Sequence, residues 1–475
     1  MSATITPLPQ QLSFDDALDQ HGVTDPGRIF RDPTAAKNKF LPVHRWVNWI
    51  AGFSGTFTGS CIDLYLPDRR PGATVLDPFA GVGTTLVEAY RRGLNTLGFE
   101  INHFAALVAR TKLQCTQISE SALSDAIAAY AKFMRPIEQE LDHAEGSSGG
   151  LAVDPSKLPV PRTRPPKGFR SRVPFFAPLV ERKVLFSLDY VASLPEELKS
   201  FFQVALGAVM VSVSNYSYEP SLSSRASAGR SSIVNAPVSH ILVKKLREMT
   251  TDQAALRKEL ASCQLNPAAA VYRQSFFSGS QEILADDSVD LVITSPPYMN
   301  NYHYVRNTRP QLFWLDFISN ASDLKALEDA NYGRYWQSVR DGEPVQLSFD
   351  LPEASLLVDQ IRSIKPEKGA YGGPGWANYV ACYLNDTDRF CSILARVLRP
   401  SGKAVIVVGN SIIQGVEVQV DRFFSILGEK NGLKTIGIYV IRGQRVGSSI
   451  VNTGLRENAT KKIPLYDAAV VLQKP

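Results

Sequence analysis

The sequence is poor in cysteine and has no long apolar run. Its five cysteines stand far apart without a Cys-x-x-Cys pair, and its six histidines show no metal-ligand spacing. These absences argue against a disulfide framework or a metal site. No segment approaches the roughly 18 apolar residues of a membrane span, and the N-terminus lacks the basic and apolar regions of a signal peptide. We therefore expect a soluble, intracellular protein without a bound metal.

The length and composition indicate a globular protein of more than one part. A chain of 475 residues exceeds an ordinary domain, so we expect one large domain and at least one sizeable insert. A hydrophobic content of 44% supports a substantial core. The net charge of +5 permits binding to nucleic acid but does not require it.

Residues 73–113 show the alternation of an α/β sheet. Strands are expected at 73–76 and 95–99, separated by a glycine-containing loop and a helix over 84–92, and Asn102 can cap a further helix. This order is typical of the opening of a doubly wound sheet. Before it, residues 39–66 are aromatic-rich and predicted helical, and residues 1–38 are expected to form an N-terminal extension.

The alternation stops over residues 114–274, which we expect to form a largely helical insert. It resumes at residue 275, so one catalytic domain is predicted from residues 39–113 and 275–475. Its later strands are expected at 289–293, 403–408, 435–441 and 468–472. The stretch 321–376 is predicted to be irregular, since its last part is rich in glycine and proline.

A loop rich in small residues follows the first strand. Gly81 and Gly83 are expected at positive φ, which lets the backbone approach a ligand closely. The loop lacks the third glycine of a dinucleotide fingerprint, which disfavours a pyrophosphate. Asp77 can hold an ammonium group and Glu100 two ribose hydroxyls; the alternative is that Asp77 caps the turn and Glu100 lies at the surface. The candidate cofactor-binding residues here are Asp77, Pro78, Phe79, Ala80, Gly81, Gly83, Thr84, Thr85, Glu100 and Ile101.

The sequence Ser295-Pro296-Pro297-Tyr298 follows the strand at 289–293. The Ser295 hydroxyl and the Pro296 carbonyl can accept hydrogen bonds from the amino group of a nucleobase, while the prolines stiffen the loop. Tyr298 can stack on a base that has been flipped out of a duplex. All four residues are therefore candidate catalytic residues. The alternative is a double-proline turn without a catalytic role.

The two motifs resemble those of the amino-methyltransferases that act on DNA. The family pattern FxGxG appears as Phe79 to Gly83, and the pattern (D/N/S)PPY as Ser295 to Tyr298. The resemblance covers residues 39–113 and 275–472. It implies a Rossmann-like fold with a mostly parallel seven-stranded sheet, S-adenosylmethionine as the cofactor and double-stranded DNA as the partner. It also implies that both motifs, although distant in the chain, lie on one sheet and face each other.

The finer assignment rests on the serine of the second motif. Serine preceded by threonine is closest to the cytosine-N4 subgroup, and adenine-N6 methylation is the alternative. An RNA or protein-glutamine methyltransferase and a catalytically idle DNA-binding protein are less favoured readings. Cytosine C5 methylation needs a cysteine nucleophile, usually after a proline, and no cysteine here follows one.

One stretch departs from the family pattern. Members often carry Gly-Asp before the second motif, whereas the matching stretch here is taken as residues 278–284, which has no acid at that place. The contact to the adenine of the cofactor is then expected from Ser280 or from the backbone.

Basic residues in the insert are candidates for reading DNA. A proline-rich run without acids can neutralise phosphates, although a linker is the alternative, and further candidates follow in the insert and after the second motif. The candidate DNA-binding residues are Lys157, Arg162, Arg164, Lys167, Arg170, Arg172, Arg225, Arg230, His303 and Arg306. The insert is therefore the candidate target-recognition region. A restriction or defence nuclease is a candidate partner, and the cytoplasm of a bacterium or archaeon, at the nucleoid, is the expected location.

Overall fold

The computed structural model describes most of the chain. The described residues are 30, 35–49, 52–146, 158–218, 221–263, 266–300, 302–364, 367, 373–443 and 464–475. Lys157 and all but residues 30 and 35–38 of the expected N-terminal extension lie outside them.

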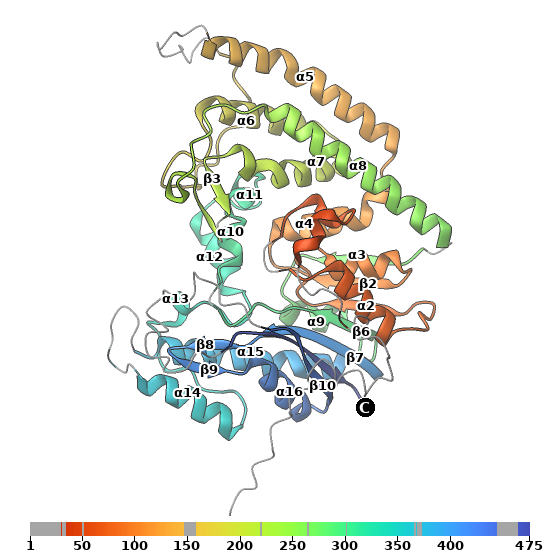
Figure 1. Ribbon diagram of the computed structural model, residues 1–475, viewed down its shortest axis with the longest axis vertical. Helices are drawn as coiled ribbons and strands as arrows, with labels where there is room; N and C mark the ends of the chain where they lie inside the picture. The colour runs from red at the N-terminus through yellow and green to blue at the C-terminus, as the bar shows by residue number, and fades with distance from the viewer. Residues whose placement is uncertain are drawn as a thin grey trace, which may run out of the picture.

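A seven-stranded, mostly parallel sheet forms the centre of the catalytic half (Figure 1). Only β11 runs against its neighbours, pairing antiparallel with β10 and β7. Across the sheet the strands are β10 (Lys434–Arg442), β11 (Asp467–Gln473), β7 (Leu398–Gly409), β6 (Val289–Thr294), β1 (Thr74–Asp77), β2 (Asn95–Phe99) and β5 (Ala269–Tyr272). The predicted α/β fold with this kind of sheet is confirmed.

Alternate residues of the central strands are buried in two cores, one on each face of the sheet. Val75 and Leu291 pack with α2 (Gly55–Tyr65) in one core, whereas Leu76 and Val292 pack in the other. The helices of this second core include α9 (Phe276–Ile283), α15 (Gly375–Val397) and α16 (Val420–Lys430). Helices α3 (Thr84–Arg91) and α4 (His103–Gln114) follow β1 and β2. A strand covered on both faces reads as a continuous apolar run, as residues 291–293 do.

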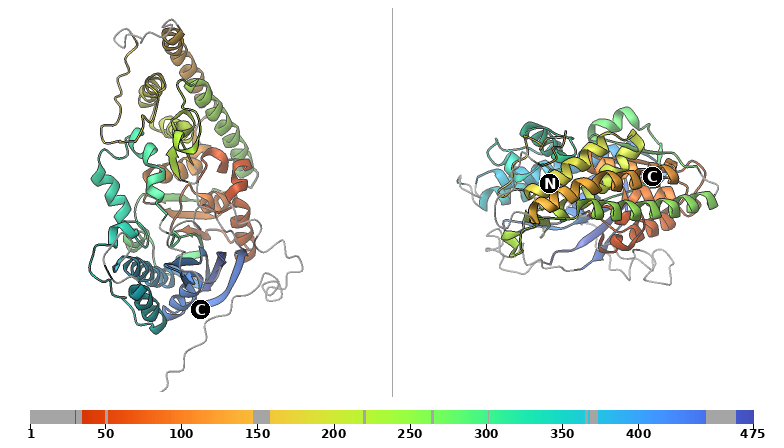
Figure 2. Two further views of the ribbon diagram at one scale, coloured as in Figure 1. Left: turned by 60° about the vertical axis from the view of Figure 1, so that its left-hand side comes forward. Right: turned by 90° about the horizontal axis from the view of Figure 1, so that it is seen from above.

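The insert forms a layer of helices above the sheet (Figures 1 and 2). Its helices are α5 (Glu120–Gly146), α6 (Pro178–Ala192), α7 (Glu196–Val209) and α8 (Val238–Cys263). Their apolar faces share one core with α4, so the insert is packed on the catalytic half and not tethered to it loosely. A short hairpin, β3 (Tyr216–Tyr218) with β4 (Leu222–Ser224), interrupts the helices.

The structure corrects the expected boundaries at three places. Strand β5 lies inside the range 114–274 assigned to the insert, so the sheet resumes before residue 275. The stretch 321–376, expected to be irregular, contains α12 (Ala321–Asp329), α13 (Trp336–Val339) and α14 (Pro352–Ile364). The range 39–66 is not one helix, because short 3-10 turns at Ala35–Phe40 and His44–Trp46 precede α2. No helix among the described residues is long and apolar enough to cross a membrane.

Candidate active site

The two sequence motifs meet at the carboxyl ends of neighbouring strands. Strands β1 and β6 pair in parallel, with Val75 opposite Leu291. The Thr294 hydroxyl donates a hydrogen bond of 2.6 Å to the Asp77 carboxylate. The expectation that both motifs lie on one sheet and face each other is therefore confirmed. The carboxyl edge of an open parallel sheet is also the usual place for a ligand.

One cavity is lined by both motifs. Its lining combines apolar and aromatic side chains with the carboxylates Asp77 and Glu100, the composition usual for a ligand site. From the predicted cofactor and catalytic residues, the lining includes Asp77, Pro78, Phe79, Ala80, Gly81, Thr84, Glu100, Ile101, Ser295 and Pro297. The structure thus brings residues from three separate chain segments to one site.

The glycine loop has the predicted backbone conformation. Gly81 has φ 50° and Gly83 has φ 82°, in the left-handed region where glycine carries no Cβ penalty. A Cβ on Gly81 would lie 3.1 Å from Trp49 Nε1, and both residues line the cavity. A Cβ on Gly83 would instead lie 3.0 Å from the Ala109 Cβ of α4. Gly81 therefore opens the cavity, whereas Gly83 permits close helix packing and does not line it.

A buried lysine also fixes this loop. Lys112 on α4 is fully buried, and its ammonium donates a hydrogen bond of 2.9 Å to the Val82 carbonyl. Val82 itself lines the cavity. Burial lowers the pKa of Lys112 to about 7. Nothing in the sequence pattern singled out this residue, since an isolated lysine on a helix usually faces solvent.

Two carboxylates with raised pKa values stand in the cavity wall. Burial raises the pKa of Asp77 to about 6, despite hydrogen bonds from Thr294 and the Phe79 amide. Burial likewise raises the pKa of Glu100 to about 7, although its oxygens accept hydrogen bonds from the amides of Asn102 (2.6 Å) and Gly81 (2.8 Å). The hydrogen bond that Asp77 accepts from the Phe79 amide, two residues further in the same turn, is 3.1 Å long. Perturbed carboxylates in a cavity are typical of functional sites.

The second motif presents a hydrogen-bond acceptor to the cavity. The Ser295 hydroxyl donates its proton to the Val407 carbonyl at 3.0 Å and also forms a hydrogen bond with the Tyr298 side chain, so one lone pair of its oxygen is left for a ligand. The Pro297 carbonyl accepts a hydrogen bond of 3.0 Å from the Tyr383 hydroxyl. Pro296 and Tyr298 do not line the cavity. The Tyr298 ring lies beside Gly409, and burial raises the pKa of its hydroxyl.

Ser280 does not line the cavity. Its side chain is buried, and its hydroxyl has no hydrogen-bond partner among the described residues. The chain segment that takes this place comes earlier, where β5 leads into α9. Its cavity-lining residues are Gln274, Ser275, Phe276 and Phe277. An adenine contact from Ser280 therefore has no support in the geometry.

Several further lining residues carry no motif. They come from the segment before α2 and from the segment after α12: Trp49, Phe53, Ala330, Asn331 and Tyr332. Tyr332 stacks on Phe277 with ring centroids 5.8 Å apart and meets Phe79 edge-on at 5.3 Å. These three rings make one wall of the cavity apolar, with the Phe79 ring standing at 82° to the Tyr332 ring. A sequence rich in aromatics near residue 49 was the only signal, and it did not indicate a site.

The basic run of the insert occupies a defined place on the surface. The amides of Arg162 and Thr163 each donate a hydrogen bond of 2.7 Å to the Asp189 carboxylate on α6, which fixes the run on the helical layer. Its described cations are exposed: Arg162, Arg164, Lys167, Arg170 and Arg172. The described part is thus an anchored segment and not a free linker. Its contact with DNA stays a prediction.

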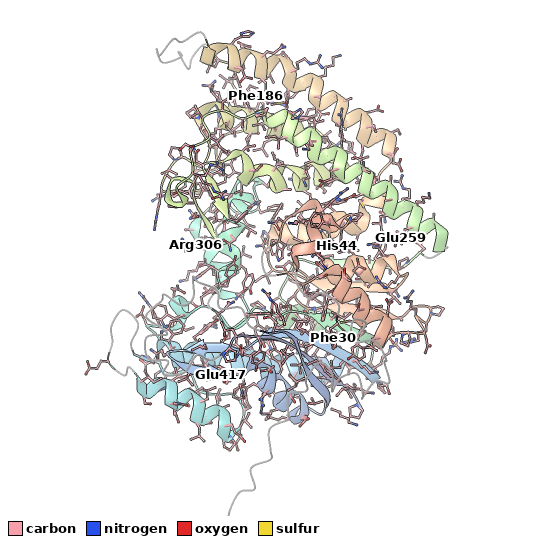
Figure 3. All side chains as sticks on the ribbon, in the orientation of Figure 1. Phe30, His44, Phe186, Glu259, Arg306 and Glu417 are labelled. Carbon is pink, nitrogen blue, oxygen red and sulfur yellow. The ribbon has the colours of Figure 1, made fainter. Side chains whose placement is uncertain are left out.

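The remaining DNA-binding candidates lie on two elements. Arg225 and Arg230 follow hairpin β3–β4, and the Arg225 guanidinium donates to the Ser231 carbonyl at 2.8 Å. His303 stacks on Tyr335 with centroids 4.4 Å apart, and burial lowers its pKa. Arg306 is exposed on α10 (Tyr304–Asn307), below hairpin β3–β4 in the view of Figure 3. None of these residues lines the cavity.

The described residues contain no group of three or more His, Cys, Asp or Glu side chains placed to hold a metal ion.

Comparison with known proteins agrees with this geometry. Residues 58–110 match the N6/N4 methyltransferase family model, described as DNA methylase. The chain is 22% identical to the Type II methyltransferase M.BsoBI of Geobacillus stearothermophilus, in an alignment that covers 92% of this chain and 87% of the relative. Over 74% of each chain, it is 25% identical to the Type II methyltransferase M.MvaI of Kocuria varians. The matched segment contains β1, the glycine loop and β2. The family match, the two long alignments and the sheet all support an amino-methyltransferase of the N4/N6 DNA methylase family.

Proposed function

We propose that the protein transfers a methyl group from S-adenosylmethionine to cytosine N4 at a specific site in double-stranded DNA. The observation that carries this proposal is the single cavity shared by the glycine loop and Ser295. The choice of cytosine rests on the neutral serine at the first position of the second motif. Methylation of adenine N6 by the same scaffold is the alternative.

The cavity residues fit the cofactor. S-adenosylmethionine supplies an electrophilic sulfonium methyl group when it is bound. Asp77 carries a negative charge for its ammonium group, and Glu100 offers acceptors for its ribose hydroxyls. Gly81 keeps the loop free of a side chain beneath Trp49. The aromatic wall of Phe79, Phe277 and Tyr332 suits the adenine ring, since aromatic rings pack well both offset-stacked and edge to face.

Ser295 has the geometry to activate a base amine. The amine of cytosine is a weak nucleophile because its lone pair is delocalised into the ring. Ser295 Oγ can accept one hydrogen bond from this amine, because its own proton is held by the Val407 carbonyl and its contact with the Tyr298 side chain leaves one lone pair unused. Such an acceptor, fixed before the reaction, lowers the barrier without reorganisation. Pro297, held through its carbonyl by Tyr383, keeps the loop rigid.

We further propose that the insert, up to the start of β5, is the target-recognition region. Its support is the anchored basic run and hairpin β3–β4, both of which belong to the insert. Residues 39–113 together with the chain from β5 onwards would then form the catalytic domain. A cognate nuclease is the proposed partner, and the bacterial or archaeal cytoplasm the proposed location.

Analysis of the methylated nucleosides tests this proposal. The purified protein is incubated with methyl-labelled S-adenosylmethionine and plasmid DNA, and the DNA is digested to nucleosides and analysed by mass spectrometry. The proposal predicts label in N4-methylcytosine. Label in N6-methyladenine would move the assignment to the alternative, and label in RNA or protein but not in DNA would contradict the proposal.

A further inference from the structure

The insert touches the segment after the second motif through one asparagine. Asn307, at the end of α10, is only 6% exposed. Its carbonyl accepts a hydrogen bond of 3.0 Å from the Tyr218 hydroxyl on β3. Its side-chain oxygen accepts a hydrogen bond of 2.9 Å from the Leu222 amide on β4. Both strands of the insert's hairpin therefore hold the same residue.

The other end of the Asn307 amide points toward the second motif. Its nitrogen donates a hydrogen bond to the Tyr302 hydroxyl, and the Tyr302 ring meets the Tyr304 ring edge-on with centroids 5.0 Å apart. The Tyr304 hydroxyl accepts a hydrogen bond of 3.3 Å from the Tyr298 amide. Tyr304 also lines the cavity beside Ser295. A series of three contacts thus leads from Asn307 to the second motif.

Neighbouring residues hold this series of contacts in place. Thr308, the next residue, accepts a hydrogen bond of 2.7 Å from the side chain of Asn102, and the Asn102 amide is bonded to Glu100. Gln311 on α11 (Arg309–Trp314) donates to the Gly207 carbonyl of the insert at 3.1 Å. Because Asn307 uses both ends of its amide, moving the hairpin must strain a buried hydrogen bond or move Tyr302.

The hairpin is also placed where DNA would act on it. The Arg172 amide, at the end of the basic run, donates a hydrogen bond of 3.1 Å to the Tyr216 hydroxyl on β3. Arg225 and Arg230 follow β4. Hairpin β3–β4 therefore lies between the exposed cations of the insert and the cavity. A phosphate contact on either side of the hairpin would therefore shift the strands that hold Asn307.

We propose that Asn307 is a positioning residue that links hairpin β3–β4 to Tyr302, Tyr304 and the second motif, so that docking of the insert on its target sequence sets the catalytic loop. This inference rests on the proposed function, because it requires the insert to read DNA. It adds a separate claim, namely that the loop of the second motif is correctly placed only when hairpin β3–β4 is correctly placed.

Two conservative substitutions remove single hydrogen bonds from this series of contacts and leave the aromatic rings in place. Tyr302→Phe removes the hydroxyl that receives the Asn307 amide, and Tyr218→Phe removes the hydroxyl that donates to the Asn307 carbonyl. Tyr130→Phe is the matched control, since the buried Tyr130 hydroxyl makes a 2.8 Å hydrogen bond with Ser187 inside the insert. Each variant loses one hydrogen-bonded tyrosine hydroxyl and keeps its ring.

The measurement is methylation of plasmid DNA at saturating cofactor, with modified positions mapped by sequencing. We expect Tyr302→Phe and Tyr218→Phe to lower the ratio of the rate at the main site to the rate at one-mismatch sites. The reduction expected for losing one such hydrogen bond is about two- to tenfold. The dissociation constant for S-adenosylmethionine should not change. The double variant should be no worse than the worse single variant, since both break one path. Tyr130→Phe should keep the wild-type ratio.

An unchanged site ratio in both variants would overturn the inference, as would additive losses in the double variant. So would an equal loss at all sites that tracks a fall in thermal stability, because a purely structural role predicts that pattern. If the wild-type protein methylates no DNA, the proposed function fails and the inference fails with it. Methylation at a defined site with unchanged ratios in the variants refutes the inference alone.

Discussion

Substitution of the two loop glycines by alanine separates the cavity from the packing around it. Both glycines have positive φ, so an alanine at either position costs roughly 1–2 kcal/mol of backbone strain. At Gly81 the new methyl would lie 3.1 Å from Trp49 Nε1. The indole can shift, but only by intruding on the cavity that it lines. We expect Gly81→Ala to cost little further stability and to raise the dissociation constant for S-adenosylmethionine about tenfold, or ~1.4 kcal/mol.

At Gly83 the added methyl group would press against helix α4. The new Cβ would lie 3.0 Å from the Ala109 Cβ and 3.1 Å from its Cα, and backbone cannot give as a side chain can. Overpacking of this kind adds roughly 1–3 kcal/mol to the strain. We expect Gly83→Ala to be the more destabilised variant and to bind the cofactor more nearly as the wild type does, because Gly83 does not line the cavity.

Urea unfolding and calorimetric titration with S-adenosylmethionine, at a temperature where both variants are folded, measure the two effects. Gly81→Ala should lose affinity and Gly83→Ala should lose stability. A wild-type dissociation constant in Gly81→Ala would refute the reasoning. So would a larger loss of affinity in Gly83→Ala than in Gly81→Ala, since it would mean that the ligand reaches the loop from the α4 side.

Two further predictions follow from the charges. Because burial raises the pKa of Glu100 to about 7 and of Asp77 to about 6, both are protonated at low pH and ionise as the pH rises. Affinity for the cationic cofactor should therefore increase between about pH 5 and 8. Glu100→Gln should remove the upper part of that rise, and a flat profile in the wild type would contradict the assignment. Neutralising Arg162, Arg164 and Lys167 together should reduce the slope of log affinity for DNA against log salt by about 0.9 per lost phosphate contact. Lys434→Gln, at the edge of the sheet, is the control; an unchanged slope in the triple variant would exclude the run from the DNA contact.

The two motifs were predictable because each is local. The glycine loop needs positive φ at fixed positions, and a rigid acceptor loop after a buried strand has to be short and proline-rich. Their meeting also followed from a general rule, since carboxyl ends of parallel strands share one edge. The raised pKa values of Asp77 and Glu100 required the structure, because they depend on burial by residues distant in the chain.

The rest of the cavity carries no local signal. Trp49 and Tyr332 reach the cavity from the segments that precede α2 and follow α12, and the spacing of residues in a single sequence does not encode such an approach. Strand β5 was missed because Ala269–Tyr272 is short and lies at the edge of the sheet. Helix α12 did have a signal: Asn320 and Asp323 form a capping box, and its spacing is visible in the sequence. The glycines and prolines later in the stretch led us to predict an irregular segment despite this signal for the start of α12.

The central claim is that Ser295 acts on the base amine in the cavity that holds the cofactor, and Ser295→Ala tests it most directly. Single-turnover methyl transfer to plasmid DNA is measured together with the dissociation constant for S-adenosylmethionine. The account predicts a fall in rate of about 10²-fold or more, the usual effect of removing one positioned hydrogen-bonding group, with the dissociation constant unchanged. A wild-type rate, or an equal loss of rate and cofactor affinity, would contradict it.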